Sequence, residues 1–274
     1  MKIYRMKLFI KNLIPPIFLI FYRKVFSINE IKFIGPFVDW ETAKKYCYGY
    51  DSEAIIDKVK NAALKVKNGE YAYERDSILF EKKDYNWFLT TAIYQSIKGE
   101  EKLRIIDFGG SLGSTYFQNK DIYTNYEIEW SIIEQDTFVN IGRKYFQSKE
   151  LLFYNNLNDL PISNYNICII SSSLQYIENY TSILDSIFSK KPDYILLDRT
   201  VITYTNKNLI FIQKNPKNIN KSSYPTHIFS ESYLLKYFKN NYYELKYSND
   251  SLFFPELKNI SAFNKGYLFK RSKS

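Results

Sequence analysis

The stretch IIDFGGSLGS (residues 105–114) decides the fold, because a buried strand runs directly into a glycine-rich turn. The apolar run at 103–108 predicts the strand, and Asp107 stands at its end. Within five positions the chain then places three glycines: Gly109, Gly110 and Gly113. Such a turn either makes a tight bend or lets a ligand touch the main chain. The helix expected from Ser114 would favour negative groups at its N-terminus.

Around this turn, short apolar runs alternate with helical patterns. Strands are expected at 103–108, 130–134, 166–170 and 194–197, and helices at 138–146, 180–188 and after Ser230. This alternation predicts an α/β fold with a mostly parallel sheet and helices on both faces. Two late runs, 242–248 and 265–271, predict an antiparallel hairpin at the C-terminal edge of the sheet. In such sheets, ligands bind at the carboxyl ends of the strands.

The N-terminal part divides into two regions by composition. Residues 1–30 form a basic and apolar arm, and residues 31–100 are expected to form a mainly helical cap, leaving 101–274 as a Rossmann-like ligand-binding domain. The apolar run at 13–22 is shorter than the roughly 20 residues a membrane helix needs, and two prolines interrupt it. Flanking lysines and arginines are typical of a membrane-surface anchor. A helix packed on the protein itself or on a partner subunit is the alternative.

Composition bounds the function in broad terms. The 274 residues carry a net charge of +9, which favours anionic partners but also follows from a coding bias toward lysine. No nucleic-acid-binding signature accompanies the charge. Two distant cysteines and a single histidine exclude a disulfide scaffold and a histidine metal cluster, so no metal is expected. We expect a cytoplasmic protein. The basic and apolar arm suggests, as an alternative, that it lies peripherally on the inner membrane.

Two cofactor classes use a glycine turn after the first strand. The dinucleotide fingerprint needs G-x-G-x-x-G and an acid about 20 residues further on. Here the first glycine of that triplet is missing, and Glu134 lies 27 positions after Asp107, so a nicotinamide enzyme fits poorly. Methyltransferases that use S-adenosylmethionine instead carry hydrophobic-hydrophobic-Asp-hydrophobic-Gly-x-Gly-x-Gly and an acid after the next strand. The chain matches this pattern with Ser111 in place of the middle glycine and Glu134 as the acid.

Further segments follow in order along nearly the whole chain: PP (15–16), FIGPFVDWETA (33–43), GYD (49–51), YERDS (73–77), DFGGSLGSTYF (107–117), EQ (134–135), SSSLQYIE (171–178), LDRT (197–200) and SYPTHIF (223–229). In these segments the chain resembles a family of S-adenosylmethionine-dependent methyltransferases from bacterial cell-surface polysaccharide clusters. The resemblance implies the class I methyltransferase fold and S-adenosylmethionine as cofactor. It implies as acceptor a sugar hydroxyl or sugar-linked group of a surface glycan or its nucleotide-activated precursor. The alternative is a non-catalytic, cofactor-binding scaffold subunit of a membrane-associated glycan assembly.

The motif assigns expected cofactor contacts: Asp107, Gly109, Gly110, Ser111, Gly113, Glu134, Gln135, Ser172 and Arg75. Glu134 would accept from the ribose hydroxyls, and Gln135 would lie near the adenine. Asp107 would either fix the turn or meet the amino-acid end of the cofactor. Ser172 is a neutral acceptor near the sulfonium or an ordinary turn residue. Arg75 is a clamp for a carboxylate or phosphate, or a surface ion pair.

Four residues are candidates for catalysis. Asp198 and Arg199 follow the fifth strand, and Tyr224 and His227 are expected just before a helix near the same edge. Methyl transfer to a hydroxyl needs an oriented acceptor and a base. His227, whose ordinary pKa is about 6.5, or Asp198 would be that base. A reaction without a single protein base stays open.

Overall fold

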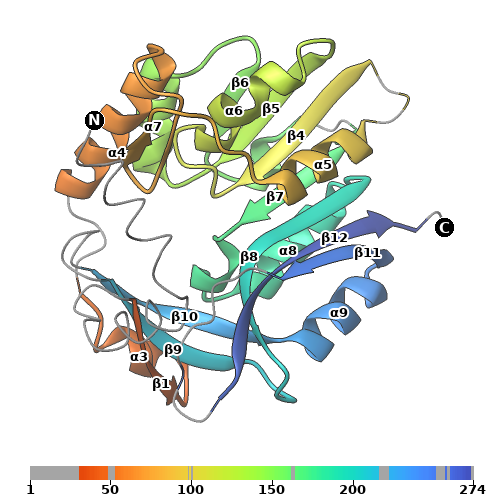
Figure 1. The fold of residues 1–274 in the computed structure, drawn as a ribbon. Coiled ribbons are helices and arrows are strands. Elements are labelled where there is room, and N and C mark those ends of the chain that lie inside the picture. The colour runs from red at the N-terminus through yellow and green to blue at the C-terminus, as the bar shows by residue number, and fades with distance from the viewer. Residues whose placement is uncertain are drawn as a thin grey trace, which may run out of the picture.

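The computed structural model describes residues 31–48, 53–97, 99, 101–161, 164–215, 222–250, 257 and 260–272 (Figure 1). The expected arm at 1–30 therefore lies outside the described residues. None of the described helices is both long enough and apolar enough to cross a membrane.

A mixed sheet forms the centre of the molecule. Five of its strands are parallel, in the order β6-β5-β4-β7-β8. Their bounds are β4 Lys102–Phe108, β5 Glu127–Ile133, β6 Leu151–Tyr154, β7 Ile167–Ser171 and β8 Tyr194–Thr203. The sheet continues with β12 Ala262–Arg271, which is antiparallel to β8, and ends at β11 Tyr243–Asp250. The predicted α/β class, its parallel strands and the antiparallel hairpin are confirmed.

The strand order explains where a ligand can enter. The chain runs outward from β4 through β5 to β6, and then returns to the other side of β4 with β7. The connections therefore diverge between β4 and β7, the position at which open parallel sheets bind ligands in a crevice outside the carboxyl ends of the strands. The glycine turn follows β4 at this point.

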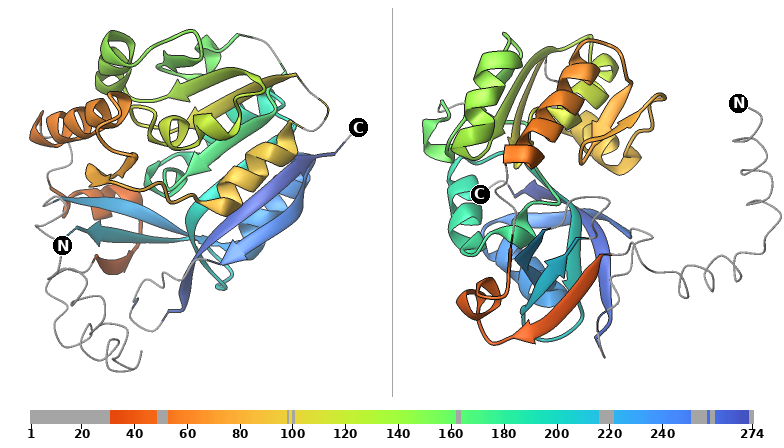
Figure 2. Two further views of the ribbon diagram at one scale, coloured as in Figure 1. Left: turned by 45° about the horizontal axis from the view of Figure 1, so that its top comes forward. Right: turned by 90° about the vertical axis from the view of Figure 1, so that its left-hand side faces the viewer.

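Helices cover both faces of the sheet (Figure 2). One face packs against α4 Glu53–Lys67, α5 Trp87–Ser96, α6 Ser114–Asn119 and α7 Asp136–Tyr145, and the other against α8 Tyr180–Ser189 and α9 Glu231–Asn240. Alternation along the strands separates the two cores: Ile105 belongs to the first and Ile106 to the second. Short 3-10 turns complete the connections: η1 Lys120–Ile122, η2 Leu157–Asp159 and η3 Leu174–Tyr176.

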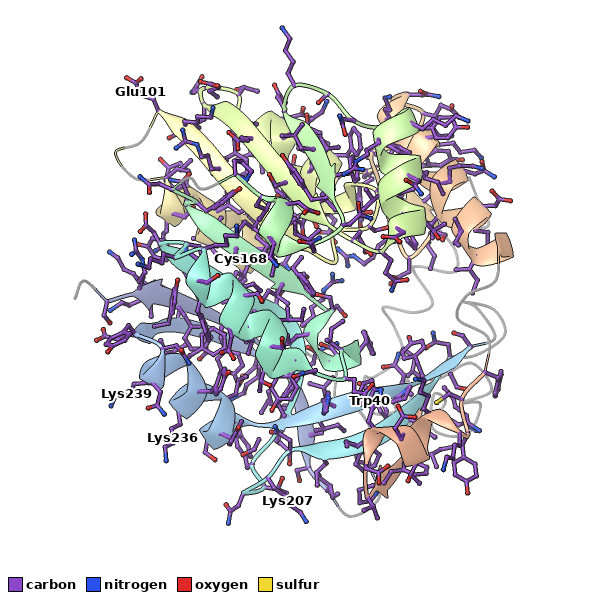
Figure 3. The ribbon with its side chains drawn as sticks, turned by 180° about the vertical axis from the view of Figure 1, so that it is seen from behind. Trp40, Glu101, Cys168, Lys207, Lys236 and Lys239 are labelled. Carbon is purple, nitrogen blue, oxygen red and sulfur yellow. The ribbon has the colours of Figure 1, made fainter. Side chains whose placement is uncertain are left out.

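Three further strands, β10, β9 and β1, extend the sheet beyond the carboxyl end of β7, and we call them the wing. The last residues of β8 pair with β10 Ser223–Ser230, which pairs with β9 Leu209–Lys214, which in turn pairs with β1 Lys32–Phe37. The helix α3 Trp40–Lys44 packs on this wing, and Trp40 lies beside β10 (Figure 3). The wing lies next to the strand ends that face the crevice.

The wing and a small hairpin correct the expectation of a mainly helical region at 31–100. The helices α3, α4 and α5 are present, but β1 belongs to the sheet, and β2 Tyr73–Arg75 pairs with β3 Ile78–Phe80. Tyr224 and His227 lie within β10, which leads directly into α9, so they stand just before a helix as expected. These strands form through pairing with distant segments, such as Lys32 with Lys214, so local patterns do not reveal them.

The hairpin β2–β3 lies against the helix that follows the glycine turn. Asp76 and Ser77 have φ angles of 52° and 67°, the left-handed pair that a two-residue hairpin turn requires. The Ser114 hydroxyl of α6 donates to the buried Glu74 carboxylate, and the Ser77 amide donates to its other oxygen at 3.0 Å. Burial raises the pKa of Glu74. The hairpin is therefore fixed beside the turn.

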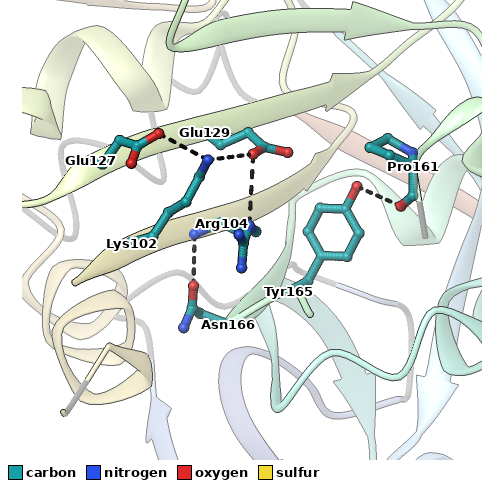
Figure 4. A network of polar contacts seen from close by, with 7 residues as sticks. All are labelled: Lys102, Arg104, Glu127, Glu129, Pro161, Tyr165 and Asn166. Atoms are coloured by element: carbon teal, nitrogen blue, oxygen red, sulfur yellow. Dashed lines mark hydrogen bonds and ion pairs between the residues drawn. The ribbon is translucent and has the colours of Figure 1, made fainter. Parts of the chain in front are cut away.

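At the opposite, amino ends of the strands, charged side chains pair with one another (Figure 4). Lys102 lies 2.9 Å from Glu127 and 3.3 Å from Glu129, and Arg104 lies 3.7 Å from Glu129. The Arg104 amide also donates to Asn166 at 2.7 Å. These contacts join β4 to β5 and to the residue before β7. Backbone with positive φ angles follows β4 and β7 at the opposite, carboxyl ends, at Gly109 and Ser172.

Candidate functional site

The glycine turn between β4 and α6 is shaped by the protein's own close contacts. Gly109 has a φ of 75°, and a Cβ there would lie 2.6 Å from the Ser173 Cβ. A Cβ on Gly110 would lie 2.6 Å from the carboxyl carbon of Asp107. Gly113 has a φ of 97° and starts α6. Glycine at 109 and 110 is therefore required by packing, independently of any ligand.

Asp107 lies beneath this turn rather than in the open crevice. Only 2% of its surface is exposed, and its Oδ2 accepts from the Trp130 indole at 2.9 Å. Burial raises the pKa of its carboxyl to about 7, with the neighbouring Glu134 adding to the rise and the indole bond opposing it. Of the two expected roles, the geometry favours fixing the turn.

Glu134 meets the glycine turn directly. It follows β5, and its Oε1 accepts from the Ser111 amide at 3.2 Å while Oε2 accepts from the Gln135 amide at 2.9 Å. Burial raises the pKa of Glu134, and the two amide bonds counteract it. A carboxylate oxygen has two lone-pair sites, so each oxygen can still accept a further hydrogen bond. Gln135 is exposed at the start of α7.

Strained backbone lies just after the end of β7 and at the point within β8 where its pairing with β7 stops. Ser172 has a φ of 58° and Arg199 a φ of 51°, both rare for residues with side chains. The two positions are adjacent, because the Ser172 amide donates to the Asp198 carbonyl at 2.9 Å. Such backbone persists where the surrounding structure holds it and clusters at ligand sites.

A polar cluster forms around Asp198, which is 4% exposed. Its Oδ2 accepts from the Ser171 hydroxyl at 2.7 Å and from the Asn86 amide at 2.9 Å, and it lies 3.4 Å from the Arg199 Nε. Arg199 also donates to the Ser171 hydroxyl at 3.1 Å. The structure brings Asp198 and Arg199 together, but within β8 rather than after its end, because β8 continues past β7 and pairs with β10. It adds Asn86, which the sequence pattern does not single out.

Three buried polar atoms in or beside this cluster lack a hydrogen-bond partner among the described residues: Arg199 Nε, Gln175 Oε1 and Thr200 Oγ1. Gln175 is held by its amide nitrogen, which donates to the Arg199 carbonyl at 3.4 Å. Buried polar groups normally have hydrogen-bond partners, so unpartnered polar atoms beside strained backbone suit a site that a ligand completes. Gln175 lies in the SSSLQY segment that the sequence marks.

His227 and Tyr224 belong to the wing. His227 stacks on Trp40 with ring centroids 4.6 Å apart, and its Nε2 lies 3.2 Å from the Glu178 carbonyl. A carbonyl only accepts, so Nε2 carries the proton and Nδ1 the lone pair. Burial lowers the pKa of the ring, and Nδ1 has no partner among the described residues. Tyr224 packs edge-on against Tyr176.

Arg75 is exposed on β2, with its guanidinium 5.8 Å from the centre of the Tyr73 ring. Its neighbour Asp76 is close enough to raise the pKa of Tyr176, although burial is the larger cause. Among the described residues, no acidic side chain lies within ion-pair distance of Arg75, so its guanidinium is not used in the alternative surface ion pair.

No group of three or more histidine, cysteine or acidic side chains within the described part of the chain could hold a metal ion.

Comparison with known proteins gives matches in structure alone. No protein-family description and no curated protein sequence matches the chain. An S-adenosylmethionine-dependent methyltransferase from Methanosarcina mazei aligns with a TM-score of 0.49 and 12% identity, over 70% of this chain and 100% of that one. The N-terminal domain of EvdMO1, in the presence of S-adenosylhomocysteine and D-fucose, aligns at 0.48 and 11% over 81% and 100%.

LepI in complex with S-adenosylmethionine aligns with a TM-score of 0.46 and 10% identity over 70% of this chain and 49% of LepI. The chain thus spans about half the length of that protein. The structural neighbours include S-adenosylmethionine-dependent methyltransferases, and at such identities the likeness concerns the fold. The sheet order β6-β5-β4-β7-β8-β12-β11, with β12 antiparallel, agrees with the mostly parallel sheet and antiparallel C-terminal edge that the sequence predicts.

Proposed function

We propose that this chain is an S-adenosylmethionine-dependent methyltransferase. The observation that carries the proposal is the meeting of Glu134 with the Ser111 amide at the carboxyl ends of adjacent parallel strands. The bonds to Ser111 and Gln135 hold an acceptor carboxylate beside the main chain of the turn, where a ribose with two hydroxyl donors would fit. Hydrogen bonds to a charged acceptor are the stronger kind.

The remaining cofactor contacts are proposed from the positions of these residues at and around the glycine turn. The main chain of Gly109, Gly110, Ser111 and Gly113 would face the adenosyl group, and Gln135 would lie beside the adenine. Ser172 and Arg75 would hold the amino-acid end. Asp107 would hold the turn from beneath. When bound, S-adenosylmethionine supplies a methyl group on a sulfonium centre.

The acceptor we propose is a sugar hydroxyl or sugar-linked group of a bacterial surface glycan or its nucleotide-activated precursor. The resemblance of the chain and its net charge of +9 support an acceptor with anionic groups. The strand-end cluster supports a polar acceptor, because Gln175 and Thr200 each offer an unused oxygen there. Arg199 would orient that acceptor and Tyr224 would line its approach.

For the base, the contacts favour His227 over Asp198. The lowered pKa keeps the His227 ring neutral at pH 7 with a lone pair on Nδ1. The Asp198 Oδ2 already receives two hydrogen bonds and lies against a guanidinium, which suits an anchor for Arg199. His227 would therefore take the proton from the acceptor hydroxyl.

Calorimetric titration with S-adenosylmethionine tests the proposal first. We expect saturable binding, and no heat at millimolar cofactor would refute it. Formation of S-adenosylhomocysteine with nucleotide-activated sugars or lipid-linked glycan precursors is the second test. Binding of the cofactor without turnover of any of these precursors would instead favour the non-catalytic scaffold subunit. This second candidate is supported by Ser111, which stands where the methyltransferase motif has glycine.

Location is a separate proposal. Both Cys47 and Cys168 are free, which suits a reducing cytoplasm. We propose that residues 1–30, which lie outside the described residues, bind the inner membrane peripherally. Deleting them should abolish co-sedimentation with anionic liposomes, and unchanged sedimentation would contradict the anchor.

A further inference from the structure

A groove of about 660 Å³ runs between α5 and the C-terminal hairpin β11–β12. These elements lie side by side in both Figure 1 and Figure 2. Trp87 stands on the α5 side and Tyr247 on the β11 side, while Leu268 of β12 forms part of the floor. The volume lies within the usual range of about 300–1,000 Å³ for small-molecule sites. No residue of the glycine turn contributes to it.

The residues that line the groove within the described part of the chain are uncharged, although 24% of the chain is charged. Two of its aromatic rings are open to solvent: Trp87 is 65% exposed and Tyr247 is 55% exposed. Between and beside them stand planar amides that can both donate and accept, namely Asn86, Gln95 and Asn249. The groove thus combines flat apolar surfaces with neutral hydrogen-bonding groups.

This combination selects one chemical class of ligand. A charged ligand would find no counter-charge among the described lining residues, and a wholly apolar ligand would leave the side-chain amides of Gln95 and Asn249 without a ligand partner. A saccharide has apolar C–H faces that stack on aromatic rings and hydroxyls that pair with amides. We propose that the groove is a binding site for a neutral oligosaccharide.

The groove also adjoins the strand-end cluster. Asn86 lines the groove, and its amide nitrogen donates to the Asp198 carboxylate at 2.9 Å. Its amide oxygen accepts from the Leu89 amide at 3.3 Å and so fixes the start of α5. Phe88, another lining residue, packs against β12, because a Cβ on Gly266 would lie 2.6 Å from its ring. Sugar units in the groove would therefore extend from the acceptor unit held at Asp198 and Arg199, a placement that rests on the proposed function.

The test is an array of neutral oligosaccharides built from hexose, deoxyhexose and N-acetylhexosamine units, probed with the full chain. We expect binding to at least one structure, and titration of that saccharide should lose at least tenfold in affinity in Trp87→Ala and in Tyr247→Ala. Tyr145→Ala is the matched control, since Tyr145 is a 38% exposed tyrosine on α7 that does not line the groove. No binding to any member of the array, or equal affinity in all variants, would overturn the proposal.

Titration of the same variants with S-adenosylhomocysteine separates this proposal from the methyltransferase assignment. We expect cofactor affinity to be unchanged by Trp87→Ala. Cofactor binding without saccharide binding would reject the groove alone. Saccharide binding that depends on Trp87, in a chain that binds no cofactor, would keep the groove and reject the methyltransferase.

Discussion

Asp107 illustrates how single residues set the geometry of the crevice. Its carboxyl group occupies the space that a side chain at Gly110 would fill, and it accepts from the Trp130 indole. The sequence predicts an acid at this strand end but leaves two roles open. Its burial and its bond to Trp130 depend on the neighbouring strand, so only the fold could separate them.

Asp107→Asn should change how stability depends on pH. The folded-state pKa of about 7 exceeds the ordinary value of 3.8, so between these values the folded chain binds a proton that the unfolded chain has lost. Asp107 therefore lowers the free energy of unfolding as pH rises through this window, by at most about 1.4 kcal/mol per unit. Denaturation from pH 4 to 8 should show this contribution in wild type and in the exposed control Asp57→Asn, but not in Asp107→Asn. Identical pH curves would contradict it.

His227→Gln tests the proposed base. With a glycan acceptor, we expect kcat to fall about 100-fold or more, because general-base catalysis contributes about 10²–10⁴. Cofactor affinity should stay the same. In wild type, kcat should fall on acidification with an apparent pKa below 6.5, since burial lowers the pKa of the ring. An unchanged kcat in the variant would remove His227 from the reaction.

At the scale of elements, the predictions succeed where local pattern suffices. The strand ending at Phe108, the helix 180–189 and the Ser230 cap all follow from periodicity and capping residues. The segment KFIGPF reads locally as a break, because Gly35 and Pro36 interrupt it, yet it pairs with β9. Asn86 was missed for a similar reason, since its bond to Asp198 joins residues 112 positions apart.

Asn86→Ala should destabilise the chain more than the loss of a helix cap alone. The substitution removes the cap of α5, worth about 1 kcal/mol, and deprives the buried Asp198 of a donor, which costs about 1–3 kcal/mol more. Asn179→Ala is the matched control, because Asn179 caps α8 without bonding to a buried carboxylate. Urea denaturation should separate the two variants, and equal losses of stability would argue against a structural bond to Asp198.

For the whole molecule, the parallel sheet and its ligand edge could be predicted from the alternation of strands and helices. The wing of β1, β9 and β10 could not, because it depends on the long β8 pairing beyond the end of β7. The candidate site likewise has a part that local sequence pattern predicts and a part that it does not. The glycine turn and Glu134 meet as the motif predicts, whereas the surroundings of His227 and the groove beside α5 arise from contacts between distant segments.

The most direct test of the account is titration of S-adenosylhomocysteine into wild type, Glu134→Gln and the exposed control Glu127→Gln. A charged hydrogen bond contributes about 1.5–3 kcal/mol, and tenfold in affinity corresponds to about 1.4 kcal/mol. We predict tight, saturable binding to wild type and Glu127→Gln, and at least tenfold weaker binding to a folded Glu134→Gln. Absence of binding to wild type, or equal affinity in all three proteins, would contradict the assignment of this crevice to an adenosyl ligand.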